Sequence, residues 1–170
     1  MDRFFGYGSL VNRRTHAYPD ARPMRVRGWR RAWRHAAARP VAYLTAERAG
    51  DVAIDGLSAG VPGGDWAALD LREAAYRREP LPEGPSIYHI PPGEDAAPSA
   101  AHPILLSYLD VVVQGYLAEF GEAGVAGFFE TTAGWDAPVR DDRAAPLYPR
   151  AQALTAEETA LVDRWLARVA

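Results

Sequence analysis

Residues 3–10 read Arg-Phe-Phe-Gly-Tyr-Gly-Ser-Leu, an aromatic and apolar run that ends in small residues. Such a run favours a β-strand, and the glycine and serine that follow favour a loop. Two glycines let the backbone come close to a ligand, and successive amides in such a turn can bind an anion. The segment therefore predicts a strand that leads into either a plain tight turn or a ligand-binding loop.

The first half of the chain alternates apolar runs with glycine-rich or charged segments, which is typical of strands and turns. Further strands are predicted at residues 24–35, 41–46, 52–61 and 86–90, with a hairpin turn at residues 49–51 and a loop at residues 91–103. Asp65 is predicted to cap a helix that runs to about Tyr76.

The second half favours helices. Helical spacing of apolar residues predicts an amphipathic helix at residues 104–120, and Gly121 and Gly124 separate it from a second piece at residues 125–131. Residues 134–149 hold three prolines and are predicted to be irregular. Thr155 and Glu158 form a capping-box pattern that begins a last helix, residues 155–169. Strands followed by helices indicate one α+β domain, a small mixed sheet or barrel with flanking helices.

Composition excludes several kinds of chemistry. The 170-residue chain has no cysteine, which excludes disulfides, thiolate nucleophiles and cysteine-based zinc sites. All 19 basic residues are arginine, which excludes Schiff-base catalysis by lysine and a P-loop lysine. The four histidines lack the spacing of metal ligands, so we expect structural or exposed roles for His16, His35, His89 and His102 and no metal site.

The charge pattern bears on possible partners. The net charge of −3 argues against nucleic-acid binding by the whole chain, although residues 22–39 hold seven arginines, no acidic residue, and Trp29 and Trp33 between them. A solvated sheet edge is favoured for this segment over a contact with an anionic substrate or a single-stranded nucleic acid. No apolar run is long enough to cross a bilayer, and the first residues lack the features of a signal peptide, so we expect a cytoplasmic protein.

Residues 69–76 read Leu-Asp-Leu-Arg-Glu-Ala-Ala-Tyr and place two carboxylates among apolar side chains. Asp70 and Glu73 are three residues apart, so they would share one face of the predicted helix. Apolar surroundings can raise the pKa of a carboxyl group and so suit it to general acid–base catalysis near neutral pH. The alternative is a solvated face on which Glu73 pairs with Arg72 and Arg77.

The chain resembles the gamma-glutamylcyclotransferase-like superfamily in three segments that occur in this order. These are residues 4–10 (Phe-Phe-Gly-Tyr-Gly-Ser-Leu), residues 26–33 (Val-Arg-Gly-Trp-Arg-Arg-Ala-Trp) and the pattern Leu69-Asp70-x-x-Glu73-x-x-Tyr76. Residues 107–110 and 114–116 are similar to the ChaC-type branch, which acts on glutathione, and its bacterial relatives. The resemblance covers about residues 1–120.

The resemblance implies a small mixed β-barrel with flanking helices, and an enzyme that releases 5-oxoproline and a free amine from a gamma-glutamyl substrate. Glu73 stands at the position of the family's catalytic glutamate. The expected substrate-binding residues are Tyr7, Gly8, Ser9, Leu10, Tyr76 and Tyr108. The expected partner is a small gamma-glutamyl molecule, and the reaction requires no metal or cofactor. Ala74 and Ala75 stand where the ChaC-type pattern is typically glycine-rich. The resemblance therefore does not determine whether the departing amine is that of glutathione or another one.

Two alternatives to a general gamma-glutamyl cyclotransferase remain at this point. One is an enzyme on the same fold that removes a gamma-glutamyl protecting group from a biosynthetic intermediate. The other is a non-catalytic protein that binds a gamma-glutamyl or other small anionic ligand. Nothing in the sequence determines the oligomeric state.

Overall fold

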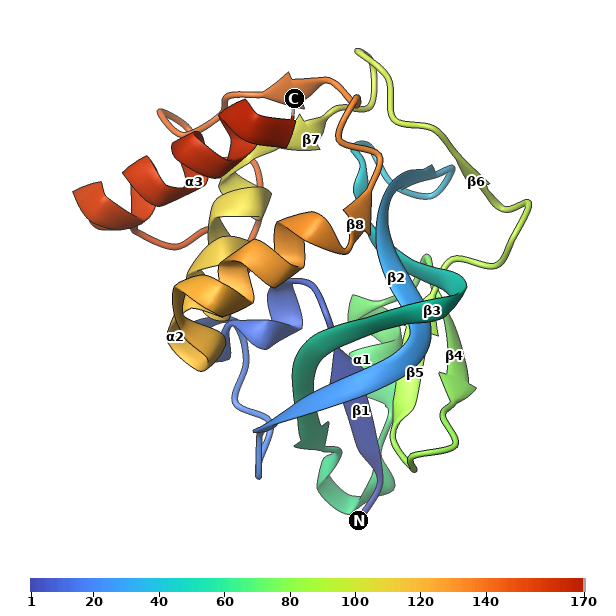
Figure 1. Ribbon diagram of the computed structural model, residues 1–170. Coiled ribbons are helices and arrows are strands. Elements are labelled where there is room, and N and C mark those ends of the chain that lie inside the picture. Colours follow the sequence, from blue (N-terminus) through green and yellow to red (C-terminus); the bar gives the residue numbers. More distant parts are fainter. Residues whose placement is uncertain (170) are drawn as a thin grey trace.

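A strongly curled β-sheet forms one side of the molecule, and helices pack along the other (Figure 1). The computed structural model describes residues 1–169. Its strands are β1 (Arg3–Gly6), β2 (Arg22–Ala36), β3 (Tyr43–Gly60), β4 (Arg77–Pro80), β5 (Ser86–His89), β6 (Asp95–Ala96), β7 (Ile104–Leu105), β8 (Thr132–Ala133) and β9 (Val139–Arg140). Its α-helices are α1 (Ala67–Arg72), α2 (Leu106–Glu130) and α3 (Ala156–Val169). The predicted class, α+β with a mixed barrel-like sheet and flanking helices, is confirmed.

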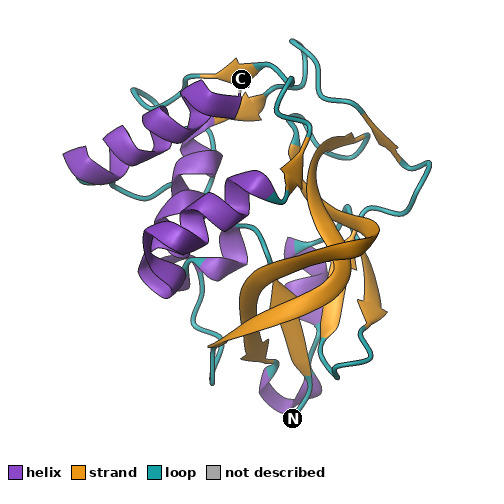
Figure 2. Cartoon of the chain, in the orientation of Figure 1, coloured by secondary structure: helices purple, strands orange, loops and turns teal. Residues whose placement is uncertain are grey.

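The main sheet has the strand order β4-β5-β1-β3-β2-β6, and β8 pairs with β2 off this path. It is mixed because β1 runs parallel to β5 and antiparallel to β3. The two long strands bend (Figure 2), and the first half of β3 approaches the end of β5, where the amide of Ile90 donates a hydrogen bond to Thr45 Oγ1 at 2.8 Å. This contact curls the sheet into a half-barrel.

The predicted hairpin turn at residues 49–51 is wrong, because β3 continues through these residues. Both halves of β3 pair with β2, so the chain reverses earlier, between the end of β2 and the start of β3. Trp29 lies opposite Arg48 and Arg27 opposite Ala53, so four residues of β3 bulge out across from Gly28. Gly28 has a φ of +80°, which a residue with a side chain rarely adopts. Residues 49–52 therefore form a bulge in β3 rather than a turn.

The helix predicted to reach Tyr76 ends earlier, at Arg72. The prediction that Asp65 is the cap is wrong, because Trp66 occupies the cap position. Asp65 precedes the cap, and its Oδ1 accepts a hydrogen bond from the amide of Ala67 at 3.0 Å. After the helix the chain turns sharply, with the amide of Tyr76 donating to the carbonyl of Glu73 at 2.8 Å. Glu73 therefore lies in the turn between α1 and β4 and does not share a helical face with Asp70.

The long helix α2 passes through the centre of the molecule. Gly121, with φ +67° and ψ −168°, interrupts it, so the two predicted helical pieces are confirmed. The first piece is not amphipathic as expected, since every residue of 106–116 is buried. It packs against the sheet, the turn Ser9–Val11 and α3, so no face is left for solvent.

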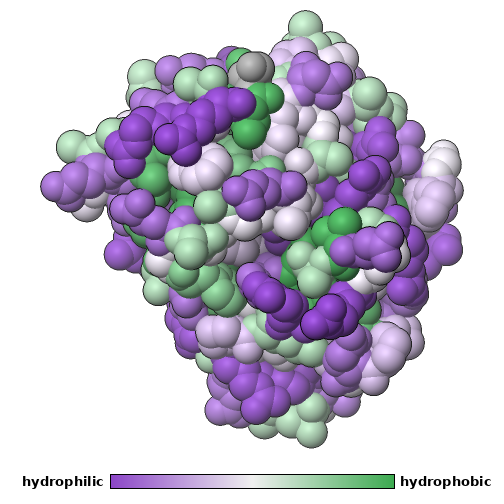
Figure 3. Space-filling view, in the orientation of Figure 1, coloured by the Kyte–Doolittle hydropathy of each residue, from purple (hydrophilic) through white to green (hydrophobic). Residues whose placement is uncertain are grey.

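The capping box that begins α3 is present as predicted. The amide of Glu158 donates to Thr155 Oγ1 at 3.1 Å, and the amide of Thr155 donates to Glu158 Oε2 at 2.8 Å. No helix within residues 1–169 has the length and apolar character that crossing a membrane requires. The face drawn in Figure 3 intersperses hydrophilic and hydrophobic residues without one broad apolar area.

Only part of the arginine-rich segment, residues 22–39, forms the predicted solvated edge of the sheet. The first half of β2 has one strand neighbour, and there Arg25 pairs with Asp55 of β3 at 2.8 Å. Further along, β8 and β6 cover the second side of β2. Arg31 in this covered part is 1% exposed.

Arg31 joins the sheet to α2 without a carboxylate in its contacts. Its Nε donates to Thr132 Oγ1 at 3.0 Å, and its Nη1 donates to the hydroxyl of Tyr116 at 3.0 Å. The guanidinium carbon lies 5.2 Å from the ring centroid of Tyr116 and 5.1 Å from that of Phe128. Neutral oxygens and two aromatic rings therefore satisfy this buried cation.

We expect Arg31→Ala to lower the free energy of unfolding by about 3–5 kcal/mol, because it removes several charge-assisted hydrogen bonds and leaves buried oxygens without donors. Arg27→Ala, on the same strand but exposed, is the control and should change it by less than about 0.5 kcal/mol. Urea unfolding followed by circular dichroism measures both values. Equal stability of the two variants would show that Arg31 does not hold α2 on the sheet.

Candidate active site

The glycines of the loop after β1 let other side chains of the protein come close to its backbone. A side-chain carbon at Gly8 would stand 2.9 Å from the hydroxyl of Tyr108, so only glycine admits this close approach. Ser9–Val11 form a 3-10 turn in which the amide of Val11 is the first to donate back, to the carbonyl of Gly8 at 3.0 Å. The amides of Ser9 and Leu10 precede that bond and have no acceptor within the turn.

Two adjoining cavities meet at Glu73. The smaller one is walled by the glycine loop, residues 5–10, together with Tyr88. The larger one has arginines and tyrosines on its wall, namely Arg39, Arg72, Arg150, Tyr43, Tyr76, Tyr108 and Tyr148. Ser9, Glu73 and Tyr108 line both cavities. Glu73 is therefore one of three residues that both cavities share.

Burial and nearby cations shift the pKa of Glu73 in opposite directions. Its side chain is 17% exposed, and burial raises the pKa of its carboxyl group above the ordinary value. Arg72, whose Nε lies 3.4 Å from Glu73 Oε1, opposes this rise, and Arg39 and Arg150 add smaller contributions of the same sign. The net pKa is raised, which suits a group that accepts and returns a proton near neutral pH.

Arg72 connects Glu73 to the glycine loop. Its Nη1 donates to the carbonyl of Thr15 at 3.1 Å, and its Nη2 lies 3.3 Å from Ser9 Oγ and 3.2 Å from Thr15 Oγ1. These bonds fix the guanidinium, so the distance between the carboxylate and the loop is fixed as well. Of the two ion pairs considered for Glu73, the one with Arg72 is present, whereas Arg77 pairs with Glu94 instead.

Two tyrosines form rigid walls beside Glu73. The hydroxyl of Tyr7 donates to the carbonyl of Tyr88, and the hydroxyl of Tyr76 donates to the carbonyl of Leu44 at 2.7 Å. Burial raises the pKa of both phenols well above the ordinary value, and the negative charge of Glu73 raises each further. Both therefore stay protonated at neutral pH and serve as walls and donors rather than as bases.

The residues expected at the site from the sequence are brought together. Tyr7, Gly8 and Leu10 line the smaller cavity, Tyr76 lines the larger one, and Ser9, Glu73 and Tyr108 line both. Asp70, the second carboxylate of the candidate segment, is not on either wall. It accepts a hydrogen bond from the hydroxyl of Tyr88 and pairs with Arg78 at 3.2 Å.

Sequence reasoning missed six residues of the larger cavity, which are Arg39, Tyr43, Arg72, Tyr148, Pro149 and Arg150. Two of them had a signal, because Arg39 ends the arginine-rich segment and Arg72 was considered as an ion-pair partner. Tyr148 and Arg150 lie in or beside the irregular segment, and nothing in the sequence pointed to them.

The irregular segment is anchored to the start of α2. Asp142 accepts hydrogen bonds from the amide of Ser107 at 2.8 Å, from Ser107 Oγ at 2.6 Å and from the amide of Leu147 at 2.8 Å. These bonds lower the pKa of Asp142 against the opposing effect of its burial. Arg143 next to it forms two bonds to Asp110, at 2.7 and 2.8 Å. The segment thereby carries its last residues to the cavity in a fixed position.

The histidines form no metal centre among residues 1–169, where no group of three or more potential ligand side chains occurs. His35 and His102 stack with ring centroids 3.7 Å apart. His89 faces Glu79 at 3.0 Å, outside the two cavities. Their placement agrees with the structural roles expected for them.

Comparisons with known proteins identify the fold. Neither the protein-family models nor the curated proteins that were searched match this sequence. Among solved structures, the chain is similar to one named gamma-glutamyl cyclotransferase, with a TM-score of 0.54 and 12% identity over 96% of this chain and 98% of that one. It is also similar to an uncharacterised protein from Homo sapiens, with a TM-score of 0.52 and 13% identity over 95% and 98% of the two chains. The half-barrel with flanking helices is thus the gamma-glutamyl cyclotransferase fold.

We expect Glu73→Gln to stabilise the protein at pH 7. The raised pKa means that ionising Glu73 costs the folded state free energy above that pKa, and the cost vanishes below the unfolded-state pKa of about 4.3. The glutamine variant should therefore melt a few degrees higher at pH 7, about 2–4 °C for each kcal/mol, with a smaller difference at pH 4. Calorimetry measures this, with the exposed Glu83→Gln as control. A lower melting temperature of Glu73→Gln at pH 7 would contradict the assignment.

Proposed function

We propose that this chain is a gamma-glutamyl cyclotransferase, which converts a gamma-glutamyl amide into 5-oxoproline and a free amine. The observation that carries the proposal is the position of Glu73, a mostly buried carboxyl group with a raised pKa that adjoins both the glycine loop and the larger cavity. The likeness in fold to a gamma-glutamyl cyclotransferase supports it.

The reaction suits a site of this kind because the substrate carries its own nucleophile. The α-amine of a gamma-glutamyl group can close a five-membered ring on the gamma-carbonyl carbon, so the step is intramolecular. The protein has to orient the chain, accept a proton and stabilise the oxyanion. A carboxylate and backbone amides suffice for these tasks, and the chemistry requires no thiol, lysine, metal or cofactor.

In the proposed mechanism Glu73 first takes a proton from the α-ammonium group. The freed amine attacks the gamma-carbonyl carbon, and the amides of Ser9 and Leu10 donate to the oxyanion that forms. Glu73 then gives its proton to the departing nitrogen as the carbon–nitrogen bond breaks. After the attack the ring nitrogen still carries a positive charge, and it loses a second proton to Glu73, which passes this proton to the departing amine as well. Overall the α-nitrogen loses two protons, the departing amine gains two and leaves as an ammonium ion, and Glu73 ends as the carboxylate.

The remaining expected residues shape the pocket for the gamma-glutamyl group in this proposal. Tyr7 and Leu10 wall the smaller cavity, and Gly8 leaves room for the hydroxyl of Tyr108. Tyr76, fixed by its bond to the carbonyl of Leu44, closes the side next to Glu73. Rigid walls of this kind hold the amine and the carbonyl close enough to react.

The direct test is product formation. Purified protein is incubated with glutathione, several gamma-glutamyl amino acids and a gamma-glutamyl amine, and 5-oxoproline is followed by mass spectrometry. We expect turnover of at least one compound and a loss of about 10²–10⁴-fold in Glu73→Gln, which keeps the shape but removes the base. Glu83→Gln, an exposed carboxylate change, should retain full activity.

Two results would contradict this proposal in different ways. Full activity of Glu73→Gln would show that another group moves the proton. Ligands that raise the melting temperature of the wild-type protein without any 5-oxoproline would instead indicate a binding protein.

The pH dependence of kcat/KM should report the ionisation of Glu73. Because the free enzyme needs the carboxylate, the rate should fall on the acidic side with an apparent pKa above the ordinary glutamate value of about 4.3. Arg72→Gln removes the cation that most favours the carboxylate, so the acidic limb should move to higher pH. Arg27→Gln, far from the site, should leave it in place. A shift to lower pH in Arg72→Gln would contradict the role of Glu73 as base.

A further inference from the structure

The turn that carries the amides of Ser9 and Leu10 is bonded through its carbonyl oxygens. The carbonyl of Gly8 accepts a hydrogen bond from the amide of Val11 at 3.0 Å, and that of Ser9 accepts from the amide of Asn12 at 3.1 Å. The carbonyl of Leu10 is bonded from outside the turn, by a histidine side chain. The orientation of this third carbonyl therefore depends on a side chain as well as on the turn itself.

That side chain is His16, whose Nε2 lies 3.0 Å from the carbonyl oxygen of Leu10. Its Nδ1 accepts a hydrogen bond from the amide of Tyr18 at 3.2 Å, so Nδ1 carries no proton. The neutral ring then has its proton on Nε2, which donates to the carbonyl of Leu10. Burial lowers the pKa of His16 and the bond to Leu10 opposes this effect, while Arg72 and Arg13 lower the pKa further, so the ring is neutral at pH 7.

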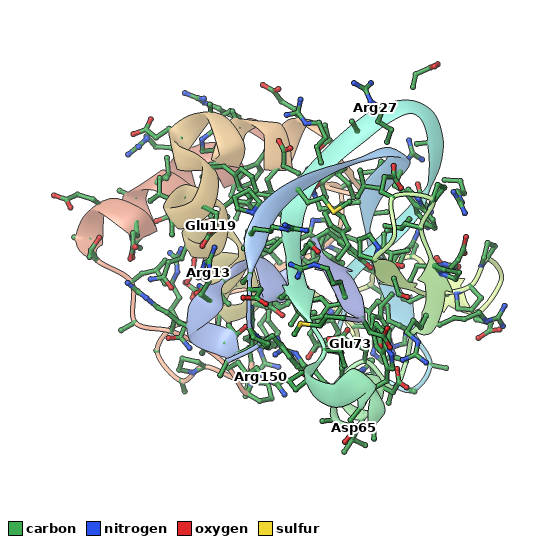
Figure 4. The ribbon with its side chains drawn as sticks, turned by 90° about the horizontal axis from the view of Figure 1, so that it is seen from below. Arg13, Arg27, Asp65, Glu73, Glu119 and Arg150 are labelled. Carbon is green, nitrogen blue, oxygen red and sulfur yellow. The ribbon has the colours of Figure 1, made fainter. Side chains whose placement is uncertain are left out.

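The backbone just before His16 is attached to α2. Arg13 forms an ion pair with Glu119 of α2, in which Arg13 Nη2 lies 3.0 Å from Glu119 Oε2. Figure 4 shows these two labelled side chains next to each other. Asn12 Nδ2 donates to the carbonyl of Val111, also on α2, at 2.9 Å. The segment that carries His16 is therefore fixed relative to the central helix.

The peptide group between Leu10 and Val11 is bonded at both of its ends. Its carbonyl oxygen accepts from His16, and its N–H donates to the carbonyl of Gly8. The amides of Ser9 and Leu10 belong to the two peptide groups that precede it along the turn. Because neighbouring peptide groups share a Cα atom, fixing this one restricts the directions in which those two amides point.

We propose that His16 is a positioning residue, whose Nε2–H bond to the carbonyl of Leu10 keeps the amides of Ser9 and Leu10 directed at the oxyanion of the reaction. This inference rests on the proposed function, because it assumes that an oxyanion forms at the glycine loop. His16 is on the wall of neither cavity, so it acts through the loop and does not touch the substrate. Since the oxyanion forms only after the attack, the bond affects the transition state more than the bound substrate.

The experiment compares two substitutions of His16 that differ in one hydrogen-bond donor. His16→Phe keeps a planar ring beside Phe4, whose ring centroid lies 6.2 Å from that of His16, but it has no donor. His16→Gln places an amide nitrogen near the position of Nε2 and so keeps a donor for Leu10. His89→Phe is the control, because His89 lines neither cavity. Values of kcat and KM are measured for each gamma-glutamyl conjugate that yields 5-oxoproline.

We expect His16→Phe to lower kcat by about tenfold or more while KM stays within about twofold, because the lost alignment affects the transition state. His16→Gln should keep kcat within about threefold of the wild-type value, and His89→Phe should leave it unchanged. Thermal melting confirms that each variant is folded at the assay temperature. A role of His16 in stability alone would lower the melting temperature without separating kcat from KM.

Nuclear magnetic resonance tests the bond without any turnover. The ¹⁵N shifts of the His16 ring distinguish a protonated from an unprotonated nitrogen, and at pH 7 we expect the proton on Nε2. The amide signals of Ser9 and Leu10 should move in His16→Phe and return towards their wild-type positions in His16→Gln. A proton on Nδ1 would overturn the inference.

The remaining outcomes separate this inference from the proposed function. Turnover with the same kcat in the wild-type protein and in His16→Phe would overturn the positioning role and leave the cyclotransferase function in place. A loss of kcat that His16→Gln does not restore would assign the effect to the ring and also overturn that role. If no conjugate yields 5-oxoproline, the proposed function fails, and the amide signals alone decide whether His16 orients the loop.

Discussion

The buried guanidinium of Arg31 determines how α2 lies against the sheet. It occupies the space between β2 and the rings of Tyr116 and Phe128, so the helix cannot shift without exposing a cation to apolar surroundings. The hydroxyl of Tyr116 also lies 2.8 Å from the carbonyl oxygen of Tyr7, at the start of the glycine loop. The hydroxyl of Tyr116 thus joins Arg31 of the sheet to the start of the glycine loop. Because Tyr116 and Tyr108 lie on the same helix, this contact also fixes the position of Tyr108.

Burial and the nearby arginines have opposite effects on the ionisation of Glu73. A buried carboxyl group holds its proton readily, which suits the return of a proton to a departing amine. The arginines around Glu73 keep the ionised form accessible, which suits the first proton transfer. Neither condition alone would give a group that performs both steps of the proposed mechanism in one turnover. The placement of Glu73 in the turn after a short helix, with Arg72 fixed beside it, provides both.

Local features were predictable from the sequence, and features that depend on distant partners were not. The strand and loop at residues 3–10 and the capping box at Thr155 follow from neighbouring residues. Glycine and aspartate at residues 49–51 favour a turn as well as a bulge, so the sequence predicts a turn there. The bulge forms because both halves of β3 pair with the same strand, β2. The helix ends early where Tyr76 bonds to Leu44, 32 residues away. The position of Arg150 depends on the bond between Ser107 and Asp142, 35 residues apart.

Because Asp142 is hydrogen-bonded to Ser107, different parts of the chain line the two cavities. In the proposed mechanism, residues of the first half supply the proton carrier and the oxyanion donors, while the last third contributes Tyr148, Pro149 and Arg150 to the wall of the larger cavity. The segment that brings them is fastened to α2 by Asp142 and Arg143 and lies outside the main sheet, so its composition can vary without disturbing that sheet. Changes in this segment would therefore alter one wall of the larger cavity and leave the sheet and Glu73 in place.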